Sequence, residues 1–352
     1  MNGTSLFSGG GIGEIFFNNL GINITIANEI EKKRADFYSN LYPNTKILTG
    51  SIQDNKIKDE IIKKSKHNKF LISTPPCQGF STIVATTKVN DFEKDPRNFL
   101  IYDTFDIIDN CDFDFIMIEN VPRFLKMLHP FNDSFLTIEE IILKKYSQKY
   151  SISFNIYDAK DFNVPQFRKR AVIKLWKKKY SWIEPKKYPE VTLSQAIGHL
   201  PSIEAGEDSG IEYHVAKSHN EREILAMKHT PTGMSAFKNK NYYPKKINGE
   251  KVSGFHNTYK RLEWSKPCKA RTTNNGNIGS HNNVHPGRKL DDDIYSDARV
   301  LTLLELFLVS SLPNDWQPPA GYGDNLIRQI IGEGIPPKMS YEIIKPIFNK
   351  IK

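Results

Sequence analysis

The segment KFLISTPPCQGFS, residues 69–81, places a cysteine directly after an apolar strand-like run and two prolines. Pro75 and Pro76 lack an N–H and have a fixed φ, so they end a strand and hold Cys77 on a stiff turn. Cysteines that pack as small hydrophobic groups more often lie inside strands or helices. The position of Cys77 therefore favours a nucleophilic thiol, and a tight turn with an incidental cysteine is the alternative that this stretch alone leaves open.

A carboxylate follows a second apolar run. The segment FDFIMIEN, residues 113–120, ends in Glu119 and Asn120, and a proline comes two residues later. In an open parallel sheet, ligands bind outside the carboxyl ends of the strands. We therefore expect Cys77 and Glu119 to lie on the same edge of one sheet. The alternative for Glu119 is a helix N-cap or an ordinary loop carboxylate.

A glycine-rich turn, LFSGGGIG at residues 6–13, lies between a short strand-like run (4–7) and a helix-like run (14–20). Glycines at such a turn let the backbone approach a ligand, and an acidic residue about 20 positions later can bind ribose hydroxyls. Glu29 has this spacing, although Glu14 replaces the last glycine of the usual GxGxxG pattern. The turn favours an adenosine-type ligand, with a purely structural strand–helix turn as the alternative.

Two arginines lie two positions apart in QFRKR, residues 166–170. In an extended chain, Arg168 and Arg170 point the same way. Paired guanidinium groups suit a carboxylate, a phosphate or a base carbonyl. The alternative is a solvated basic start to the following strand.

The elements that must position these groups alternate between strand-like and helix-like runs in the first half, which predicts parallel βαβ units. From about Glu184 to Arg299 the chain is rich in Gly, Pro, Asn, His and Lys and predicts loops. A turn is expected at 334–337 before a terminal helix. Further strands are expected at 23–30, 69–74, 113–120 and 170–176, and a further helix at 299–312.

Bulk properties narrow the class of protein. A chain of 352 residues exceeds what one core comfortably supports, so two lobes are expected. The net charge of +9 permits binding to nucleic acid without requiring it. Three cysteines without metal spacing argue against a disulfide or zinc scaffold and fit a reducing compartment. No run approaches the roughly 20 apolar residues of a membrane span, and no signal peptide is visible. A cytoplasmic location is therefore expected.

Four segments in this order and roughly this spacing, LFSGGG, PPCQGFS, ENV and QFRKR, resemble the DNA cytosine-5 methyltransferases. Further matches are DPRNFL (95–100), KARTT (269–273), RVLTLLE (299–305) and IGEGIPP (331–337). The resemblance extends from Leu6 to Pro337. It implies an α/β fold with a Rossmann-like domain that uses S-adenosylmethionine, and a smaller, loop-rich target-recognition domain.

The same resemblance implies a division of labour. A catalytic and cofactor-binding domain would comprise residues 1–184, completed by 318–352. The target-recognition domain would comprise residues 185–317, and its variable stretch 185–298 would read base edges in the major groove.

The resemblance assigns Cys77 as the nucleophile that adds to cytosine C6, since covalent catalysis divides a difficult step into easier ones. Glu119 would hold or protonate the base at N3 and N4. Arg170 would contact O2, and Arg168 would support the nucleophile loop. The base must flip out of the duplex to be reached. Transfer of the methyl group converts S-adenosylmethionine into S-adenosylhomocysteine, and no metal is expected.

The remaining residues that the resemblance assigns bind cofactor or DNA. Thr272 would anchor a phosphate. The cofactor pocket would comprise Phe7, Gly9, Gly11, Glu29, Ile30, Ile52, Pro75 and Leu100, and the other DNA contacts would be Gln78, Ser81 and Asn120.

Four positions depart from the family pattern. The family often has Asp where Ser5 and Ser51 stand, glycine where Asn98 stands, and asparagine where Glu333 stands. None of the four removes a catalytic group, but all bear on cofactor affinity.

The resulting prediction is a monomeric bacterial enzyme that methylates double-stranded DNA and does not associate with a membrane. It would belong to a restriction–modification system or act alone. A cognate restriction endonuclease would act separately. Two alternatives stay open. One is an RNA methyltransferase of the same fold, disfavoured because the second lobe has no Cys-Phe-Thr element. The other is a DNA-binding homologue with weak or no catalysis.

Overall fold

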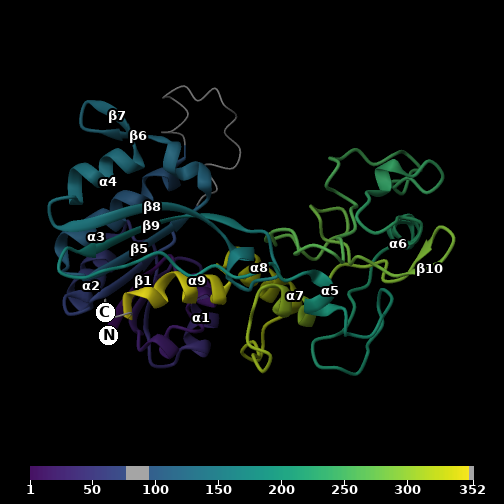
Figure 1. Cartoon of the computed structure of the whole chain (residues 1–352), viewed down its shortest axis with the longest axis horizontal. Coiled ribbons are helices and arrows are strands. Elements are labelled where there is room, and N and C mark those ends of the chain that lie inside the picture. Colours follow the sequence, from purple (N-terminus) through teal and green to yellow (C-terminus); the bar gives the residue numbers. More distant parts are fainter. Residues whose placement is uncertain (77–94, 349–352) are drawn as a thin grey trace. The chain divides into compact units, whose positions relative to one another are not determined.

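The structure, a computed structural model, describes residues 1–76 and 95–348 (Figure 1). Its contacts divide the chain into two compact units. Unit 1 comprises residues 1–158, 169–186 and those from Ser340 onward, and unit 2 comprises residues 159–168 and 187–339. Which residues perform chemistry and which choose the target remains the prediction made above.

Unit 1 is built on a seven-stranded sheet of order β3-β2-β1-β4-β5-β9-β8. The first five strands in that order are parallel, as the alternating sequence pattern predicts, and β9 is antiparallel to both neighbours. The strands are β1 (Asn2–Leu6), β2 (Asn23–Glu29), β3 (Lys46–Thr49), β4 (Phe70–Ser73), β5 (Phe115–Asn120), β8 (Tyr150–Asp158) and β9 (Lys169–Lys177). The strands predicted from sequence are confirmed with shifts of one or two residues at their ends.

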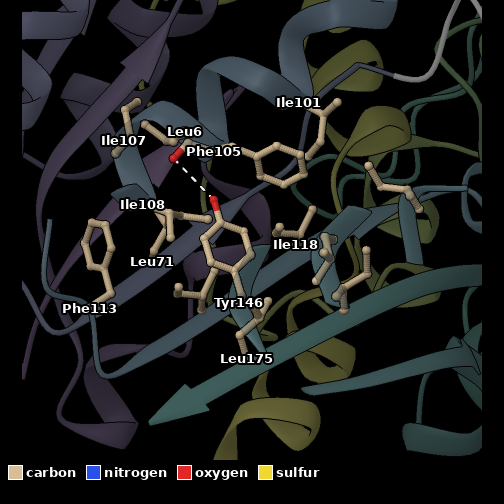
Figure 2. Close-up of a cluster of buried hydrophobic side chains, with 14 of the residues drawn as sticks. Leu6, Leu71, Ile101, Phe105, Ile107, Ile108, Phe113, Ile118, Tyr146 and Leu175 are labelled. Atoms are coloured by element: carbon tan, nitrogen blue, oxygen red, sulfur yellow. Dashed lines mark hydrogen bonds between the residues drawn. The ribbon is translucent and has the colours of Figure 1, made fainter. Parts of the chain in front are cut away.

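Helices α3 (Leu100–Asn110) and α4 (Ile138–Tyr146) pack on this sheet around an apolar core (Figure 2). Phe105 and Ile108 of α3 and Tyr146 of α4 lie against sheet residues such as Leu71, Ile118 and Leu175. The Tyr146 hydroxyl donates to the Phe105 carbonyl at 3.4 Å, which satisfies a polar group inside the core. All six residues of β5 are buried, and such continuous apolar runs are typical of parallel sheets covered on both faces.

The helices of unit 1 are α1 (Lys32–Leu41), α2 (Asn55–Ser65), α3 (Leu100–Asn110) and α4 (Ile138–Tyr146). Short 3-10 turns are η1 (Ile12–Glu14), η2 (Asn18–Leu20), η5 (Pro96–Phe99), η6 (Pro122–Lys126) and η9 (Lys345–Phe348), and β6 (Leu128–Phe131) with β7 (Ser134–Thr137) forms a small hairpin.

The last described helix, α9 (Pro337–Ile344), begins in unit 2 and continues into unit 1, where it packs beside the first residues of the chain. The Ser340 hydroxyl donates to the carbonyl of Gly13, and the Tyr341 ring meets Phe16 edge-on at 5.9 Å. The indole N–H of Trp182 donates to the Ile343 carbonyl at 2.8 Å. Three separate stretches of sequence therefore complete unit 1.

Two predicted helices differ in the structure. Residues 14–20 are not an α-helix, and η1 and η2 stand there instead. Asparagine favours turns over helix interiors, and Gly21 ends the segment at a φ of 67°. The helix expected at 299–312 is shortened to α7 (Leu303–Val309), because the Thr302 side chain and Glu305 form a capping box that fixes its start.

Unit 2 has little regular structure between 185 and 298, as its composition predicts. Its elements are η7 (Ala159–Phe162), α5 (Leu193–Ile197), α6 (Glu221–Lys228), η8 (Ala236–Lys238), β10 (Lys289–Asp291), β11 (Ile294–Tyr295), α7 and α8 (Asp324–Glu333). Buried guanidinium groups support these loops by donating to backbone carbonyls. Arg261 donates to the carbonyls of Met227 and His285, and Arg328 to that of Leu301. Five N–H donors on a rigid fork suit arginine to carbonyls that have no ladder partner.

Two further properties of the described residues concern membrane spans and cysteines. None of the helices in 1–76 and 95–348 has the length and apolar character that crossing a bilayer requires. Cys111 and Cys268 are buried thiols that form no disulfide.

Candidate active site

The glycine turn after β1 adopts backbone conformations that few residues tolerate. Gly9 and Gly11 have φ values of 55° and 75°, and Phe7, which is not a glycine, has a φ of 56°. The Gly11 N–H closes the turn by donating to the Ser8 carbonyl at 2.9 Å. Left-handed backbone at a non-glycine residue is costly and concentrates at ligand sites. The predicted cofactor residues Phe7, Gly9 and Gly11 therefore form one strained turn at the carboxyl end of β1.

The two glycines face different surroundings. A Cβ on Gly9 would meet no atom within 4 Å, so the backbone there borders open space. A Cβ on Gly11 would lie 2.4 Å from the Tyr42 ring and 2.8 Å from the Tyr38 ring. Gly9 thus leaves room for a ligand to approach the main chain, whereas Gly11 lets the turn pack on α1.

Glu29, the last residue of β2, reaches back to the glycine turn. Its Oε2 accepts from the Gly9 N–H at 2.9 Å and its Oε1 from the Glu31 N–H at 2.8 Å. Each carboxylate oxygen keeps a second lone pair, which can accept from a ribose hydroxyl. Ile30, the next residue, is 62% exposed, which is unusual for an isoleucine and suits an apolar contact with a base.

The other predicted cofactor residues follow neighbouring strands. Ile52 is buried just after β3, Pro75 is buried after β4, and Leu100 opens α3 and packs against the apolar core. Since β1 to β4 run parallel and adjacent, their carboxyl ends meet at one edge of the sheet. The residues present fit an adenosine-type cofactor: an open main chain at Gly9, a Glu29 carboxylate with lone pairs left for hydroxyl donors, and exposed apolar surface at Ile30.

The buried carboxyl of Glu14, which was given no role from the sequence, lies beside the glycine turn. Glu14 accepts from the Ser5 hydroxyl at 2.5 Å and from the Tyr38 hydroxyl at 2.6 Å. The Tyr42 hydroxyl donates to the Gly11 carbonyl at 2.7 Å. Burial raises the pKa of Glu14 to about 7, and the hydrogen bonds from Ser5 and Tyr38 lower it only in part. A charged residue within an apolar run was the sequence signal for this group.

Glu119 lies at the carboxyl end of β5 beside Arg170 of β9. The Arg170 Nε is 2.7 Å from the Glu119 Oε1, and both side chains are mostly buried. The antiparallel register pairs Glu119 with Val172 and Asn120 with Ala171, which brings both side chains to the end of the sheet. The arrangement can bind one edge of a planar heterocycle that offers both donors and acceptors.

Asn120 ties this strand end to the predicted nucleophile turn. Its Nδ2 donates to the Pro75 carbonyl at 3.1 Å, and its Oδ1 accepts from the Val121 N–H at 2.8 Å. The described part of the turn, through Pro76, is thus linked directly to β5. Cys77, Gln78 and Ser81 lie outside the described residues.

Arg168 and Arg170 have different partners, although they lie two residues apart. Within unit 2, the Arg168 guanidinium donates to the carbonyls of Arg271 and Glu333 at 2.7 and 2.8 Å. Arg168 is buried, and it joins the segment before Thr272 to the end of α8. Its position is that of a structural clamp, while Arg170 contacts the candidate catalytic carboxylate.

Thr272 is exposed on a turn that is held against α8. Asn275 Nδ2 donates to the carbonyls of Thr272 and Arg328 at 2.7 and 2.8 Å. A Cβ on Gly332 would lie 2.2 Å from the Thr272 carbonyl oxygen, so only glycine permits this approach. The Thr272 hydroxyl is therefore presented from a fixed backbone, as a phosphate contact requires.

No three His, Cys, Asp or Glu side chains converge as a metal site anywhere in residues 1–76 and 95–348.

Comparisons with protein families and with known sequences identify the family of this chain. A family model described as "C-5 cytosine-specific DNA methylase" matches residues 1–349. The chain is 46% identical over 350 residues to the Type II methyltransferase M1.HgaI of Avibacterium volantium, covering 99% of this chain and 98% of that protein. It is 28% identical to the Type II methyltransferase M1.HphI of Haemophilus parahaemolyticus, covering 98% of this chain and 86% of that protein.

Solved structures agree on the fold. A putative DNA modification methyltransferase encoded within an E. coli prophage matches with a TM-score of 0.69 at 18% identity, covering 99% of this chain and 98% of that one. A mutant of Spodoptera frugiperda DNMT2 matches with a TM-score of 0.65 at 15% identity, covering 99% of both chains. The predicted Rossmann-like α/β fold is confirmed.

Proposed function

The chain belongs to the C-5 cytosine-specific DNA methylase family, and from that premise we propose that it methylates a flipped-out cytosine at C5 in one specific sequence of double-stranded DNA, through a covalent bond between Cys77 and C6. It is a DNA cytosine-5 methyltransferase, and its relatives are Type II enzymes of restriction–modification. The observation that carries the finer proposal is the Glu119–Arg170 pair at the end of β5.

This pair supplies what activation of the ring needs. Glu119, when protonated, donates to cytosine N3, and its other oxygen accepts from the N4 amino group. The Arg170 guanidinium, 2.7 Å from that carboxyl, would contact O2. Protonation at N3 draws electron density from C6 and makes addition there easier, and acid–base assistance of this kind contributes about 100-fold or more.

Cys77 is the proposed nucleophile. Its thiolate forms the S–C6 bond, and the C5–C6 electron pair becomes available at C5. After methyl transfer, loss of the C5 proton returns an electron pair to the ring and expels the sulfur. Asn120, bonded to the Pro75 carbonyl, positions the start of the turn that carries the thiol. Positioning of reacting groups is worth several kcal/mol.

S-adenosylmethionine supplies an electrophilic methyl group when it is bound, and S-adenosylhomocysteine is the product. Glu29 would hold the ribose hydroxyls, Gly9 would border the ligand without a side chain, and Ile30 would contact the adenine. Phe7, Gly11, Ile52, Pro75 and Leu100 complete the proposed pocket at the ends of β1 to β4.

We assign target choice to residues 185–317 and chemistry to residues 1–184 with 318–352. Gln78, Ser81 and Asn120 would contact the flipped base or its strand, and Thr272 a phosphate. The enzyme would act as a monomer in a bacterial cytoplasm, with any cognate restriction endonuclease acting separately.

The test uses labelled S-adenosylmethionine and a duplex that wild type methylates. We expect Cys77→Ser to abolish transfer while DNA binding persists, because a hydroxyl is a much weaker nucleophile than a thiolate. Cys111→Ser is the matched control, since Cys111 is a buried thiol away from the sheet edge.

A duplex carrying 5-fluorocytosine should trap a gel-stable adduct with wild type, because fluorine cannot leave as a proton does. Turnover by Cys77→Ser near the wild-type rate would refute the mechanism.

A second variant tests Glu119. Glu119→Gln keeps the shape but cannot deliver a proton, so we expect a fall in kcat of about 100-fold or more. If this variant keeps most of its turnover, Glu119 has a structural role only.

A further inference from the structure

Two exposed hairpins of unit 2 have opposite charge. The first, here called the lysine hairpin, comprises residues 244–252. Lys245 pairs with Lys251, and the Lys246 N–H donates to the Glu250 carbonyl at 2.8 Å. Gly249 turns the chain at a φ of 83°. From residue 238 to residue 256 the sequence has five lysines and one glutamate.

The second, here called the aspartate hairpin, comprises β10, β11 and the loop between them, residues 289–295 (Figure 1). Its turn consists of Asp291, Asp292 and Asp293. Leu290 beside the turn is 65% exposed. Like charges repel, so three carboxylates in a row keep this hairpin from approaching a polyanion.

The base of the lysine hairpin is fixed. The Tyr243 hydroxyl donates to the Val252 carbonyl at 3.1 Å, and its ring stacks on Phe237 at 5.2 Å. Phe237 and Val252 pack against an apolar cluster of unit 2 that includes Met227 and Tyr259. The hairpin therefore projects from a well-packed base.

At the tip, the Lys246 ammonium pairs with the Glu250 carboxylate at 3.0 Å, and the Lys251 ammonium lies 5.1 Å from the centre of the Tyr243 ring. Ile247 is 87% exposed, more than any other large apolar side chain in the described ranges. Lys245, Lys246 and Lys251 surround it and are also exposed. An exposed isoleucine flanked by lysines suits an anionic surface that also presents an apolar group: the lysines pair with the anions and the isoleucine contacts the apolar group.

We propose that the lysine hairpin enters the major groove of the target DNA, and that Ile247 contacts the C5-methyl group of a thymine in the recognition sequence. The major groove admits a two-stranded ribbon, and the thymine methyl is the apolar group displayed there. The lysines contact flanking phosphates, which position the ribbon without reading sequence. The inference rests on the proposed function and names which residues of the 185–317 region read a base.

The first experiment measures equilibrium binding of the full chain to its target duplex, once bisulfite mapping has defined that target. Each thymine is replaced in turn by deoxyuridine, which lacks only the methyl group. One replacement should weaken wild-type binding about 4-fold, the value of one buried methyl-sized group. Ile247→Ala should weaken binding to the unmodified duplex and should lose the sensitivity to that deoxyuridine.

Leu290→Ala is the matched control, because it truncates an exposed aliphatic side chain on the aspartate hairpin. It should keep both the affinity and the deoxyuridine response of wild type. The inference is overturned if no deoxyuridine weakens wild-type binding, or if Ile247→Ala keeps the full response. The unfolding midpoint of each variant confirms that the surface change leaves the fold intact.

The second experiment measures the salt dependence of binding. Lys245→Ala and Lys246→Ala should each lower the slope of log affinity against log salt by about 1, because each phosphate contact releases counterions. Lys289→Ala on the aspartate hairpin is the control and should leave the slope unchanged. Unchanged slopes for both hairpins would contradict the groove placement.

Failure of this inference can be told apart from failure of the proposed function. If wild type transfers no labelled methyl group to any DNA, the proposed function fails. If wild type methylates its target while Ile247→Ala binds and responds to deoxyuridine as wild type does, the function stands and the assignment of Ile247 is wrong.

Discussion

Two buried glutamates, one in each unit, have pKa values that are shifted in opposite directions. Glu14 of unit 1 is 6% exposed and Glu305 of unit 2 is 1% exposed. Burial raises the pKa of Glu14 to about 7, because its partners are the uncharged hydroxyls of Ser5 and Tyr38. Burial also works against ionisation of Glu305, but His285 and the two-pronged contact with Arg299 outweigh it and hold the pKa well below its usual value.

The difference shows that burial alone does not set the charge of a carboxyl group. Hydroxyl donors satisfy both oxygens of Glu14 without supplying a positive charge, so its ionised form stays costly. A guanidinium beside Glu305 makes the ionised form the stable one. The first carboxyl is poised to change state near neutral pH, and the second is a permanent anion of the loop-rich core.

The largest effect is expected from Glu305→Ala. The change leaves the buried Arg299 charge with Asp297, one of the two acidic partners seen among the described residues, and it removes the capping box of α7. Breaking a buried ion pair from one side costs about 3–5 kcal/mol. Urea unfolding at pH 7 measures the loss, and Glu221→Ala, at an exposed position of α6, is the control. A loss below about 1 kcal/mol would show that the buried network contributes little.

Glu14→Gln should change how stability depends on pH. The folded pKa of Glu14, about 7, lies above its ordinary value of 4.5. The folded state therefore holds the proton longer than the unfolded chain, and this group lowers stability as pH rises from 4.5 to 7. Between pH 5 and pH 8 the wild-type loss from this group is about 2–3 kcal/mol.

Glutamine does not titrate, so the variant should lack this decline and gain stability relative to wild type as pH rises. Urea unfolding at several pH values measures both curves. Parallel curves for the two proteins would mean that Glu14 is already ionised throughout and that its acidity resembles that of Glu305.

Tyr38→Phe removes one of the two donors to Glu14 and leaves the ring in place. A hydrogen bond to a charged group is worth about 1.5–3 kcal/mol, and one to a neutral group about 1 kcal/mol. The loss should therefore be greater at pH 8 than at pH 5. Because the ring that packs against Gly11 is kept, binding of S-adenosylhomocysteine, measured by calorimetry, should change little. An equal loss at both pH values would indicate that the carboxyl does not change state.

Ser5→Ala should have the smallest effect, about 1 kcal/mol, because a single hydroxyl donor is lost from a site that Tyr38 still serves. The measurable sign is a further rise in the midpoint of the pH-dependent decline, since one hydrogen bond that lowers the pKa of Glu14 is gone. A fall in that midpoint would contradict the role given to Ser5.

Much of unit 1 follows from local sequence, and the reason is physical. Four of the five parallel strands, β1, β2, β4 and β5, appear as apolar runs ended by glycine, proline or polar residues, whereas the short strand β3 was not predicted. The residues proposed for the cofactor lie at or after the ends of β1 to β4. Local sequence could not predict the Glu119–Arg170 contact, because this contact depends on the antiparallel register of β5 and β9. Spacing alone could not predict that Arg168 would bind carbonyls of distant loops instead of an anion.

The buried arginines that hold the loops of unit 2 could not be predicted from local sequence. Arginine usually lies at the surface, so nothing local marks Arg261, Arg271, Arg299 and Arg328 as buried residues. Some of their carbonyl partners lie tens of residues away in sequence, as with Arg261 and Met227 and with Arg299 and Ile203. Composition predicts the loops correctly but does not predict what holds them. The partners of Glu14 were missed for the same reason, since Tyr38 comes 24 residues later.

The return of α9 to the first residues of the chain has a consequence for biosynthesis. The Ser340 contact with Gly13 joins the glycine turn to residues that the ribosome adds after all of unit 2. At about 5–20 residues per second, roughly 15–65 s separate the two ends of that contact. A nascent chain therefore lacks this support of the glycine turn until the intervening residues of unit 2 have been translated.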